Sequence, residues 1–340
     1  MKRHVNIPIF IPHLGCPNTC VFCNQRTISG VNEFKPDSVT KEIESALSTV
    51  GPDTECEIAF FGGSFTGIDR ELMISLLKTA YSYIEKGRIS SVRCSTRPDY
   101  ISDEILDILK RYGVKTIELG LQSTSDKVLK ATKRGHSFAD EERAARLITE
   151  RGFDLVGQMM IGLPGSTPKD ELMTADFIIK SGAVAARIYP TVVFHGTELC
   201  EMAERGEYTP ISNEEAAVRS AKVYERFFDA GINVIRIGLH AQESLTDTSK
   251  YYGGASHSAM GELVLGEFYY ERIKKALGKL NAPADAKINI SVPRGALSCA
   301  IGQNKRNKLR LTSEYSFKSV TFKEDPSLEK GVIKVSMEGR

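Results

Sequence analysis

Three of the seven cysteines lie within eight positions near the start of the chain, in the stretch HLGCPNTCVFCNQRTISG. Cys16, Cys20 and Cys23 have the spacing C-x3-C-x2-C, and Phe22 comes directly before the last of them. Thiolates bind iron–sulfur clusters and soft metals. A closed zinc site needs four ligands, and His13 stands outside the common zinc spacings. The three thiols therefore favour a [4Fe–4S] cluster with one open iron, and zinc or simple burial are the alternatives.

The composition sets the class of protein. The 340 residues are 41% hydrophobic with a formal net charge of +2, so the overall charge requires neither nucleic acid nor a membrane. No apolar run approaches the roughly 18 residues that span a bilayer, and Asn6 and two prolines interrupt the apolar N-terminal stretch. We therefore expect a cytoplasmic protein with no membrane partner. A disulfide framework is not expected, because the other cysteines stand singly at Cys56, Cys94, Cys200 and Cys299.

Strand-like and helix-like segments alternate along most of the chain. Six such units lie within about 200 residues, from the strand-like VNIPIFI at 5–11 to AARIYPTVVF at 185–194. One further helix–strand pair follows over 213–240. The alternation predicts an α/β fold with a parallel sheet covered by helices, and the number of units suits a partial (β/α)6 barrel. In such folds the chemistry is placed at the carboxyl ends of the strands.

Polar residues stand at or near several of these predicted strand ends, where they would face the mouth of the barrel. A double glycine, in FFGGSF, closes another strand and allows a close backbone approach. The ordinary alternatives are a tight turn, a solvated loop residue or a structural salt bridge. The candidates are Gly62, Gly63, Ser64, Arg97, Glu118, Gln122 and Gln158.

The cysteine motif, placed after a first strand and before a (β/α) series, resembles that of the radical S-adenosylmethionine (SAM) superfamily. The resemblance implies that Cys16, Cys20 and Cys23 hold the cluster, whose open iron chelates the amino and carboxylate groups of SAM. Reduction by a donor such as flavodoxin or ferredoxin would then cleave SAM and release a 5′-deoxyadenosyl radical. Phe22 would lie beside the adenine. The segment Gly62–Gly63–Ser64 would contact the methionine amino group, with serine where the family often has glutamate.

Further strings resemble the radical domain of the Elongator catalytic subunit, over roughly residues 8–240. They are STRPDY (95–100), IELGLQS (117–123), RGHS (134–137), MMIGLPGST (159–167), IYPTVVFHGT (188–197) and RGEY (205–208). The resemblance implies that Arg97, Glu118, Gln122 and Gln158 bind cofactor and that Tyr189 lines the substrate pocket. Arg187 stands where Elongator proteins usually carry lysine. We find no acetyltransferase domain or acyl-CoA loop here, so we expect that the acetyl-CoA reaction does not carry over.

Near the other end, CAIGQNKRNKLRL resembles the KH modules of the transcription factor NusA, in which a GXXG loop clamps the nucleic-acid backbone. Lys305 replaces the second glycine of that loop. We expect Gly302, Lys305, Arg306 and Lys308 to contact RNA, and an ordinary solvated helical face is the alternative. The predicted domains are a radical SAM barrel at 1–240, a connector packing on the barrel at 241–283, and a KH-like module at 284–338.

Together these features predict a radical SAM enzyme that modifies a base of tRNA or rRNA. A different enzyme class is the first alternative: a radical oxidoreductase acting on a small molecule such as a tetrapyrrole, similar to the oxygen-independent coproporphyrinogen oxidases. A second alternative is an RNA-binding protein that uses the cluster as a structural staple.

Overall fold

The computed structural model describes residues 3–16, 20–31, 33–51, 53–239 and 247–338. Its main sheet has seven strands in the order β1-β2-β3-β4-β5-β6-β8, and all neighbouring pairs are parallel. The predicted partial barrel of parallel strands is confirmed. The strands are β1 (Arg3–Ile11), β2 (Thr54–Gly62), β3 (Ser91–Thr96), β4 (Val114–Gln122), β5 (Asp154–Ile161), β6 (Ala185–Pro190) and β8 (Asn233–Ile237).

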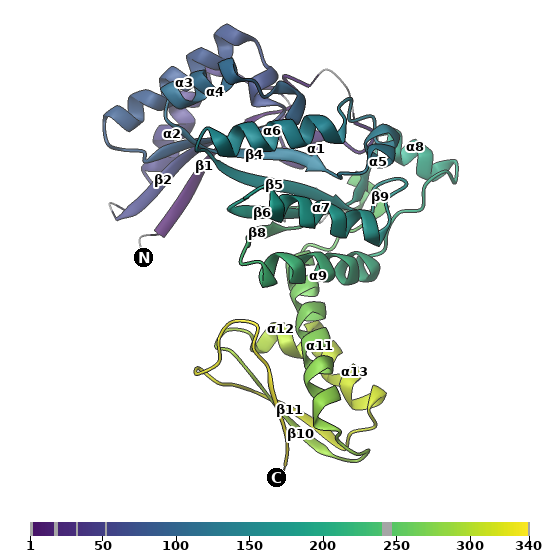
Figure 1. The fold of residues 1–340 in the computed structure, drawn as a ribbon. Helices are drawn as coiled ribbons and strands as arrows, with labels where there is room; N and C mark the ends of the chain where they lie inside the picture. The colour runs from purple at the N-terminus through teal and green to yellow at the C-terminus, as the bar shows by residue number, and fades with distance from the viewer. Residues whose placement is uncertain (1–2, 17–19, 32, 52, 240–246, 339–340) are drawn as a thin grey trace.

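Helices connect these strands and cover the sheet (Figure 1). Their starts carry strong caps: Ser137 and Thr167 each form a capping box with an aspartate three residues later. The bounds are α1 (Gln25–Ser29), α2 (Val39–Leu47), α3 (Arg70–Glu85), α4 (Asp103–Arg111), α5 (Asp126–Ala131), α6 (Phe138–Glu150), α7 (Pro168–Lys180), α8 (Glu198–Glu204) and α9 (Asn213–Asp229).

The strand predicted over 185–194 divides into two. β6 ends at Pro190, and β7 (Val192–Phe194) leaves the main sheet to pair antiparallel with β9 (Tyr251–Gly254). Proline has no backbone N–H for the ladder, so a strand ends readily at this position. Thr191 marks the change of direction, because both its backbone N–H and its hydroxyl donate to the carbonyl of Ile161.

A smaller three-stranded sheet lies toward the C-terminus, in the order β11-β10-β12. β10 runs parallel to β11 and antiparallel to β12. Two short helices, α12 and α13, connect β10 to β11 and are separated by the loop at 302–305. The bounds are α11 (Met260–Leu280), β10 (Lys287–Val292), α12 (Leu297–Ile301), α13 (Arg306–Glu314), β11 (Ser319–Glu324) and β12 (Lys334–Met337).

The long helix α11 joins the two parts, and Figure 1 shows it running from α9 down into the C-terminal module. Phe268 on α11 packs edge-on against Tyr224 of α9, with ring centroids 5.0 Å apart. The Arg272 guanidinium lies 4.7 Å from the ring centroids of both Phe228 and Phe268. One hydrophobic core therefore extends from the barrel into the module. Within the described ranges, no helix has the length and apolar character needed to cross a membrane.

Candidate active site

The three clustered cysteines follow β1, at the carboxyl end of the parallel strands. Cys20 is buried, and Cys16 and Cys23 are half-buried. Burial first, and then the neighbouring thiols Cys20 and Cys16, raise the pKa of Cys23 to about 12. The thiols are therefore close enough to oppose one another's ionisation. A bound cationic cluster would instead lower their pKa values and favour the thiolates. The three residues at 17–19 lie outside the described part of the chain.

His13 and Gln25 close the cysteine loop by reciprocal hydrogen bonds. The backbone N–H of His13 donates to Gln25 Oε1 across 2.6 Å, and the backbone N–H of Gln25 donates to His13 Nε2 across 3.1 Å. Burial, with Arg26 nearby, lowers the pKa of His13, so its ring stays neutral and can accept this bond. One of the two ring nitrogens of His13, Nε2, is therefore already used within the protein.

The double glycine brings the end of β2 against the cysteine loop. The N–H of Gly63 donates to Ile11 O across 2.7 Å, and the N–H of Ser64 donates to Leu14 O across 3.0 Å. A Cβ atom on Gly63 would lie 1.9 Å from Leu14 O, which no side chain can tolerate. The glycines therefore allow the end of β2 to pack closely against the backbone of the cysteine loop. Their contact with a cofactor stays a prediction.

Ser64 has a buried hydroxyl that is fully used inside the protein. Its Oγ lies 2.9 Å from Thr96 Oγ1 and accepts the backbone N–H of Arg97 across 3.2 Å. Ser64 therefore holds the chain at Arg97. Its predicted contact with cofactor also stays a prediction.

Arg134 contacts the cysteine motif directly, which the sequence analysis did not predict. Its Nη1 donates to Cys20 Sγ across 3.3 Å, and its Nη2 donates to Gly120 O across 2.5 Å. A guanidinium at this position stabilises negative charge on sulfur. The one available signal was its place in RGHS, a string that the sequence analysis recognised as a whole.

Arg97 and Gln122 present unpaired polar atoms beside this arginine. Arg97 binds both oxygens of Asp99 across 2.9 Å and donates to the carbonyl of Arg134, but its Nη1 is buried and has no partner among the described residues. Gln122 sits at a bulge of β4 with φ of 74°, and its Oε1 is buried and unpaired as well. Buried unpaired groups are rare and point to a missing partner.

Gly120 allows the side chains of Gln122 and Arg134 to approach the backbone of β4 closely. A Cβ atom there would lie 3.1 Å from Gln122 Nε2 and 3.5 Å from Arg134 Nη2. A guanidinium N–H and an amide oxygen are suitable partners for the carboxylate and amino groups of an amino acid. The residues therefore fit a cluster on three thiolates together with the methionine end of SAM.

Glu118 holds the predicted substrate residues in place. Arg187 Nε lies 2.7 Å from Glu118 Oε2, and Arg93 Nη1 lies 2.8 Å from Glu118 Oε1. Arg187 Nη1 in turn approaches the Tyr189 hydroxyl at 3.4 Å. Both carboxylate oxygens of Glu118 thus contact arginine, so Glu118 positions Arg187. Its predicted contact with cofactor stays a prediction.

Gln158 pairs in register with Gly120 on one side and Arg187 on the other, which places the three residues in one row across the sheet. Phe22 is half-buried and packs beside Val21 and Leu199 in a small cluster under α8. Leu199 donates its backbone N–H to Val21 O across 2.8 Å, which fixes α8 to the cysteine loop. The predicted cofactor contacts of Gln158 and Phe22 stay predictions.

His136 and Glu141 form a buried pair shortly after Arg134 in the chain. Burial first, then the charge of Arg134, lowers the pKa of His136 to about 3. Burial raises the pKa of Glu141 well above its ordinary value. Both shifts favour the uncharged forms of the two side chains, and His136 Nε2 and Glu141 Oε1 lie 3.1 Å apart, within hydrogen-bond distance.

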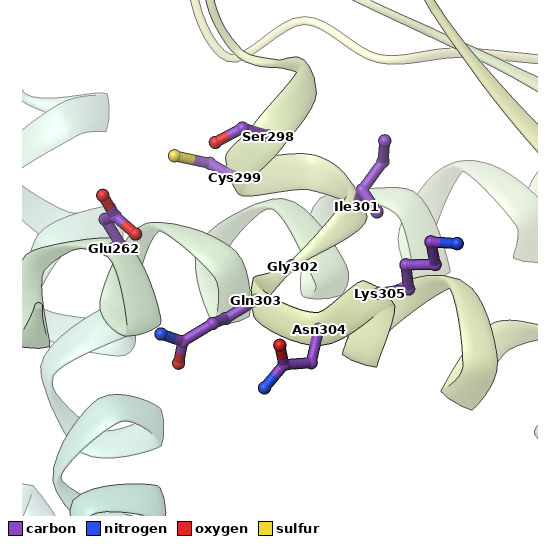
Figure 2. Close-up of a pocket in the computed structure, with 8 residues that line it drawn as sticks. All are labelled: Glu262, Ser298, Cys299, Ile301, Gly302, Gln303, Asn304 and Lys305. Carbon is purple, nitrogen blue, oxygen red and sulfur yellow. The ribbon is translucent and has the colours of Figure 1, made fainter.

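The C-terminal module has a separate cavity of about 340 Å³ beside the loop at 302–305 (Figure 2). Gly302, Asn304 and Lys305 all have positive φ, so this loop turns in a way that ordinary helices do not. The cavity is lined by Glu262, Ser298, Cys299, Ile301, Gly302, Gln303, Asn304 and Lys305.

Asn307 anchors this loop, and the sequence analysis did not select it. Its buried amide donates to Gly266 O of α11 across 2.8 Å. Of the predicted RNA contacts, Lys305 is exposed at the cavity, whereas Arg306 faces Glu267 at 3.8 Å and Lys308 is half-buried one turn further along α13. The structure therefore brings Gly302 and Lys305 together and places Arg306 and Lys308 beside them.

Comparison with known proteins identifies related chains. Residues 10–178 match the family model of the Radical SAM superfamily, and residues 184–270 match that of the Radical_SAM C-terminal domain. An uncharacterized protein of Methanocaldococcus jannaschii is 31% identical over 226 residues, which cover 63% of this chain and 69% of that protein.

A tRNA uridine(34) acetyltransferase of Methanocaldococcus infernus is 31% identical over 204 residues. This match covers 54% of the present chain and 38% of that protein, so the chain spans well under half the length of this relative. The solved structure of the archaeal Methanocaldococcus infernus Elp3 superposes with a TM-score of 0.60 at 21% identity, over 85% of this chain and 71% of that one. The resemblance to the Elongator radical domain is thereby confirmed.

Replacement of Gly63 tests the contact between β2 and the cysteine loop. In Gly63→Ala the new methyl group would meet Leu14 O, so the loop must shift, and we expect a loss of roughly 2–4 kcal/mol of stability with much less iron bound after anaerobic reconstitution. Gly278→Ala is the matched control, because nothing lies within 4 Å of its added Cβ atom. Equal iron content in the two variants would contradict this role of Gly63.

Glu141 gives a prediction on pH. The pKa of Glu141 is raised in the folded protein, whereas in the unfolded chain it is near 4.5. As the pH rises above about 4.5, the unfolded chain releases this proton while the folded protein keeps it, so the free energy of unfolding falls. Glu141→Gln cannot titrate, so we expect its stability relative to the wild type to be greater at pH 8 than at pH 5, measured by urea unfolding. The control Glu142→Gln, at an exposed neighbour, should change less in relative stability between the two pH values. If the stability of Glu141→Gln relative to the wild type were the same at pH 5 and pH 8, the neutral pair would be excluded.

Proposed function

This chain belongs to the radical SAM superfamily, whose members use a [4Fe–4S] cluster and S-adenosylmethionine, and we propose that it cleaves SAM reductively to modify a base of tRNA or rRNA. One observation carries the proposal: three cysteine thiols lie beside unpaired, buried polar atoms of Arg97 and Gln122 at the carboxyl end of the sheet.

Each residue has a role that its contacts support. Cys16, Cys20 and Cys23 would hold the cluster, and Arg134 would stabilise the sulfur of Cys20 through its bond from Nη1. When bound, the cluster and SAM supply a 5′-deoxyadenosyl radical, with electrons from a reductant such as flavodoxin or ferredoxin.

Arg97 Nη1 has no partner among the described residues and would donate to the carboxylate of the methionine end, and its other nitrogens are fixed by Asp99 and by the Arg134 carbonyl. A guanidinium held in this way needs no reorganisation when its ligand arrives. Arg187 and Tyr189 stand further inside the barrel, oriented by Glu118. They would orient the substrate.

RNA is the substrate that the C-terminal module supports. The exposed Lys305 projects from a loop that also carries the left-handed Gly302 and Asn304, and α13 continues with Arg306 and Lys308. A loop of this kind next to basic side chains can hold a phosphate backbone. A relative that bears the name tRNA uridine(34) acetyltransferase is 31% identical to this chain over 38% of its own length, which supports RNA as the substrate class.

The first test concerns the chemistry. The reconstituted protein should produce 5′-deoxyadenosine from SAM under anaerobic, reducing conditions, and Cys16→Ala should abolish both production and cluster loading. Cys299→Ala serves as the control, because this half-buried cysteine lies in the C-terminal module, far along the chain. Normal production by Cys16→Ala would overturn the assignment.

The second test concerns the substrate. Lys305→Ala should weaken tRNA binding and lower the slope of log affinity against log salt by about one for the lost phosphate contact. The exposed Lys78→Ala on α3 should change neither quantity, and 5′-deoxyadenosine production without RNA should be equal in all three proteins. Equal binding by Lys305→Ala, together with an unchanged nucleoside profile in RNA from cells lacking the protein, would favour a small-molecule substrate.

A further inference from the structure

A second group of metal-binding side chains lies on α8 and in the turn before it. His195 Nδ1, Cys200 Sγ and a carboxylate oxygen of Glu204 all lie within 4.8 Å of one another. Cys200 and Glu204 are four residues apart, so the helix places both side chains on one face. Cys200 is buried, while His195 and Glu204 are exposed. None of the three belongs to the cysteine motif or to the candidate SAM contacts.

The backbone around these residues is held firmly. The N–H of His195 donates to Lys250 O across 3.2 Å, and its carbonyl accepts from Asn24 Nδ2 across 3.3 Å. Thr197 caps α8 by accepting the N–H of Cys200 across 3.2 Å, and its hydroxyl donates to Phe194 O. The histidine and the helix that carries the other two ligands are therefore fixed relative to one another before any ligand binds.

Two of the three separations among these side chains match the edges of a tetrahedral metal site. Cys200 Sγ lies 3.6 Å from His195 Nδ1 and 3.6 Å from Glu204 Oε1. With zinc–sulfur bonds of about 2.3 Å and zinc–nitrogen or zinc–oxygen bonds of about 2.0–2.1 Å, the sulfur-to-nitrogen and sulfur-to-oxygen edges of a tetrahedron are each about 3.6 Å. Both separations measured in the protein therefore equal the edges that a bound zinc ion requires.

The local charge favours a cation. Besides Glu204, α8 carries Glu198 and Glu201, and Glu207 follows it. Three of these carboxylates are already paired: Glu198 with Lys133 at 2.6 Å, and Glu207 and Glu201 with Arg205 at 2.7 Å and 3.8 Å. Glu204 has no ion-pair partner among the described residues, so its carboxylate is the one available to a cation.

We propose that His195, Cys200 and Glu204 form a binding site for one divalent zinc-type ion, separate from the cluster cysteines. Imidazole, thiolate and carboxylate together suit zinc, and three protein ligands leave a fourth position for water. The site has a structural consequence, because Leu199 beside Cys200 is bonded to Val21 within the cysteine motif. A metal here fixes α8 and, through it, the loop that carries the cluster ligands.

The test measures zinc and iron separately in the full chain with its cluster reconstituted, so that iron already occupies the motif cysteines. We expect one zinc ion per chain after dialysis, and zinc X-ray absorption that shows one sulfur ligand with nitrogen and oxygen. Glu204→Gln should weaken zinc binding at least about tenfold, and Cys200→Ala should do the same. Glu201→Gln is the matched control, since Glu201 is exposed on the same helix, and it should bind zinc as the wild type does.

Three outcomes would overturn the proposal. Zinc lost from the wild type on dialysis would leave the three side chains as a hydrogen-bonded cluster without metal. Equal affinity in Glu204→Gln and Glu201→Gln would place the ion elsewhere, and absorption showing three sulfur ligands would place it in the cysteine motif. Because Glu204 is exposed, its variant keeps the test valid even if Cys200→Ala fails to fold.

Discussion

The site depends on one close backbone approach, that of Gly63 to the carbonyl of Leu14, which leaves no space for a Cβ atom. This contact sets the position of the cysteine loop against the end of β2. From the same turn, the Ser64 hydroxyl holds the backbone of Arg97, and the Arg97 side chain in turn binds the carbonyl of Arg134. Because Arg134 donates to Cys20 Sγ, a chain of hydrogen bonds connects the glycine turn to one of the proposed cluster ligands.

Buried charge governs the interior of the barrel next to this site. Glu57 and Glu118 are each 2% exposed, and they are matched by Arg93, which binds both, and by Arg187, which binds Glu118. Removing one partner of such a network leaves an uncompensated buried charge, which is strongly destabilising. Arginine suits this position because its planar fork can bind a carboxylate with two parallel bonds, which lysine cannot do. The orientation of Arg187 toward Tyr189 is therefore set by the core of the barrel.

The features that could be predicted from the sequence are those that depend on residues close together in the chain. Alternating strands and helices gave the parallel barrel, and the spacing of Cys16, Cys20 and Cys23 gave the cluster motif. Features that depend on distant contacts were missed. The contact of Arg134 with Cys20 joins residues 114 positions apart, and nothing near Ser64 signalled that its hydroxyl would be used by Thr96 and Arg97. The strand over 185–194 looked continuous because its apolar character continues through Pro190, although the backbone pairing does not.

The connection through α11 bears on how an RNA would reach the site. Phe268 and Arg272 pack against the aromatic side chains of α9, and Gly331 of the C-terminal module packs against Phe228. A packed interface of this kind fixes the module relative to the barrel, whereas a flexible linker would allow it many positions. An RNA held at the loop of residues 302–305 would then meet the barrel at a set separation. If the enzyme acts on RNA as proposed, the choice of base follows in part from this fixed distance, since only a nucleotide that spans it can enter the barrel.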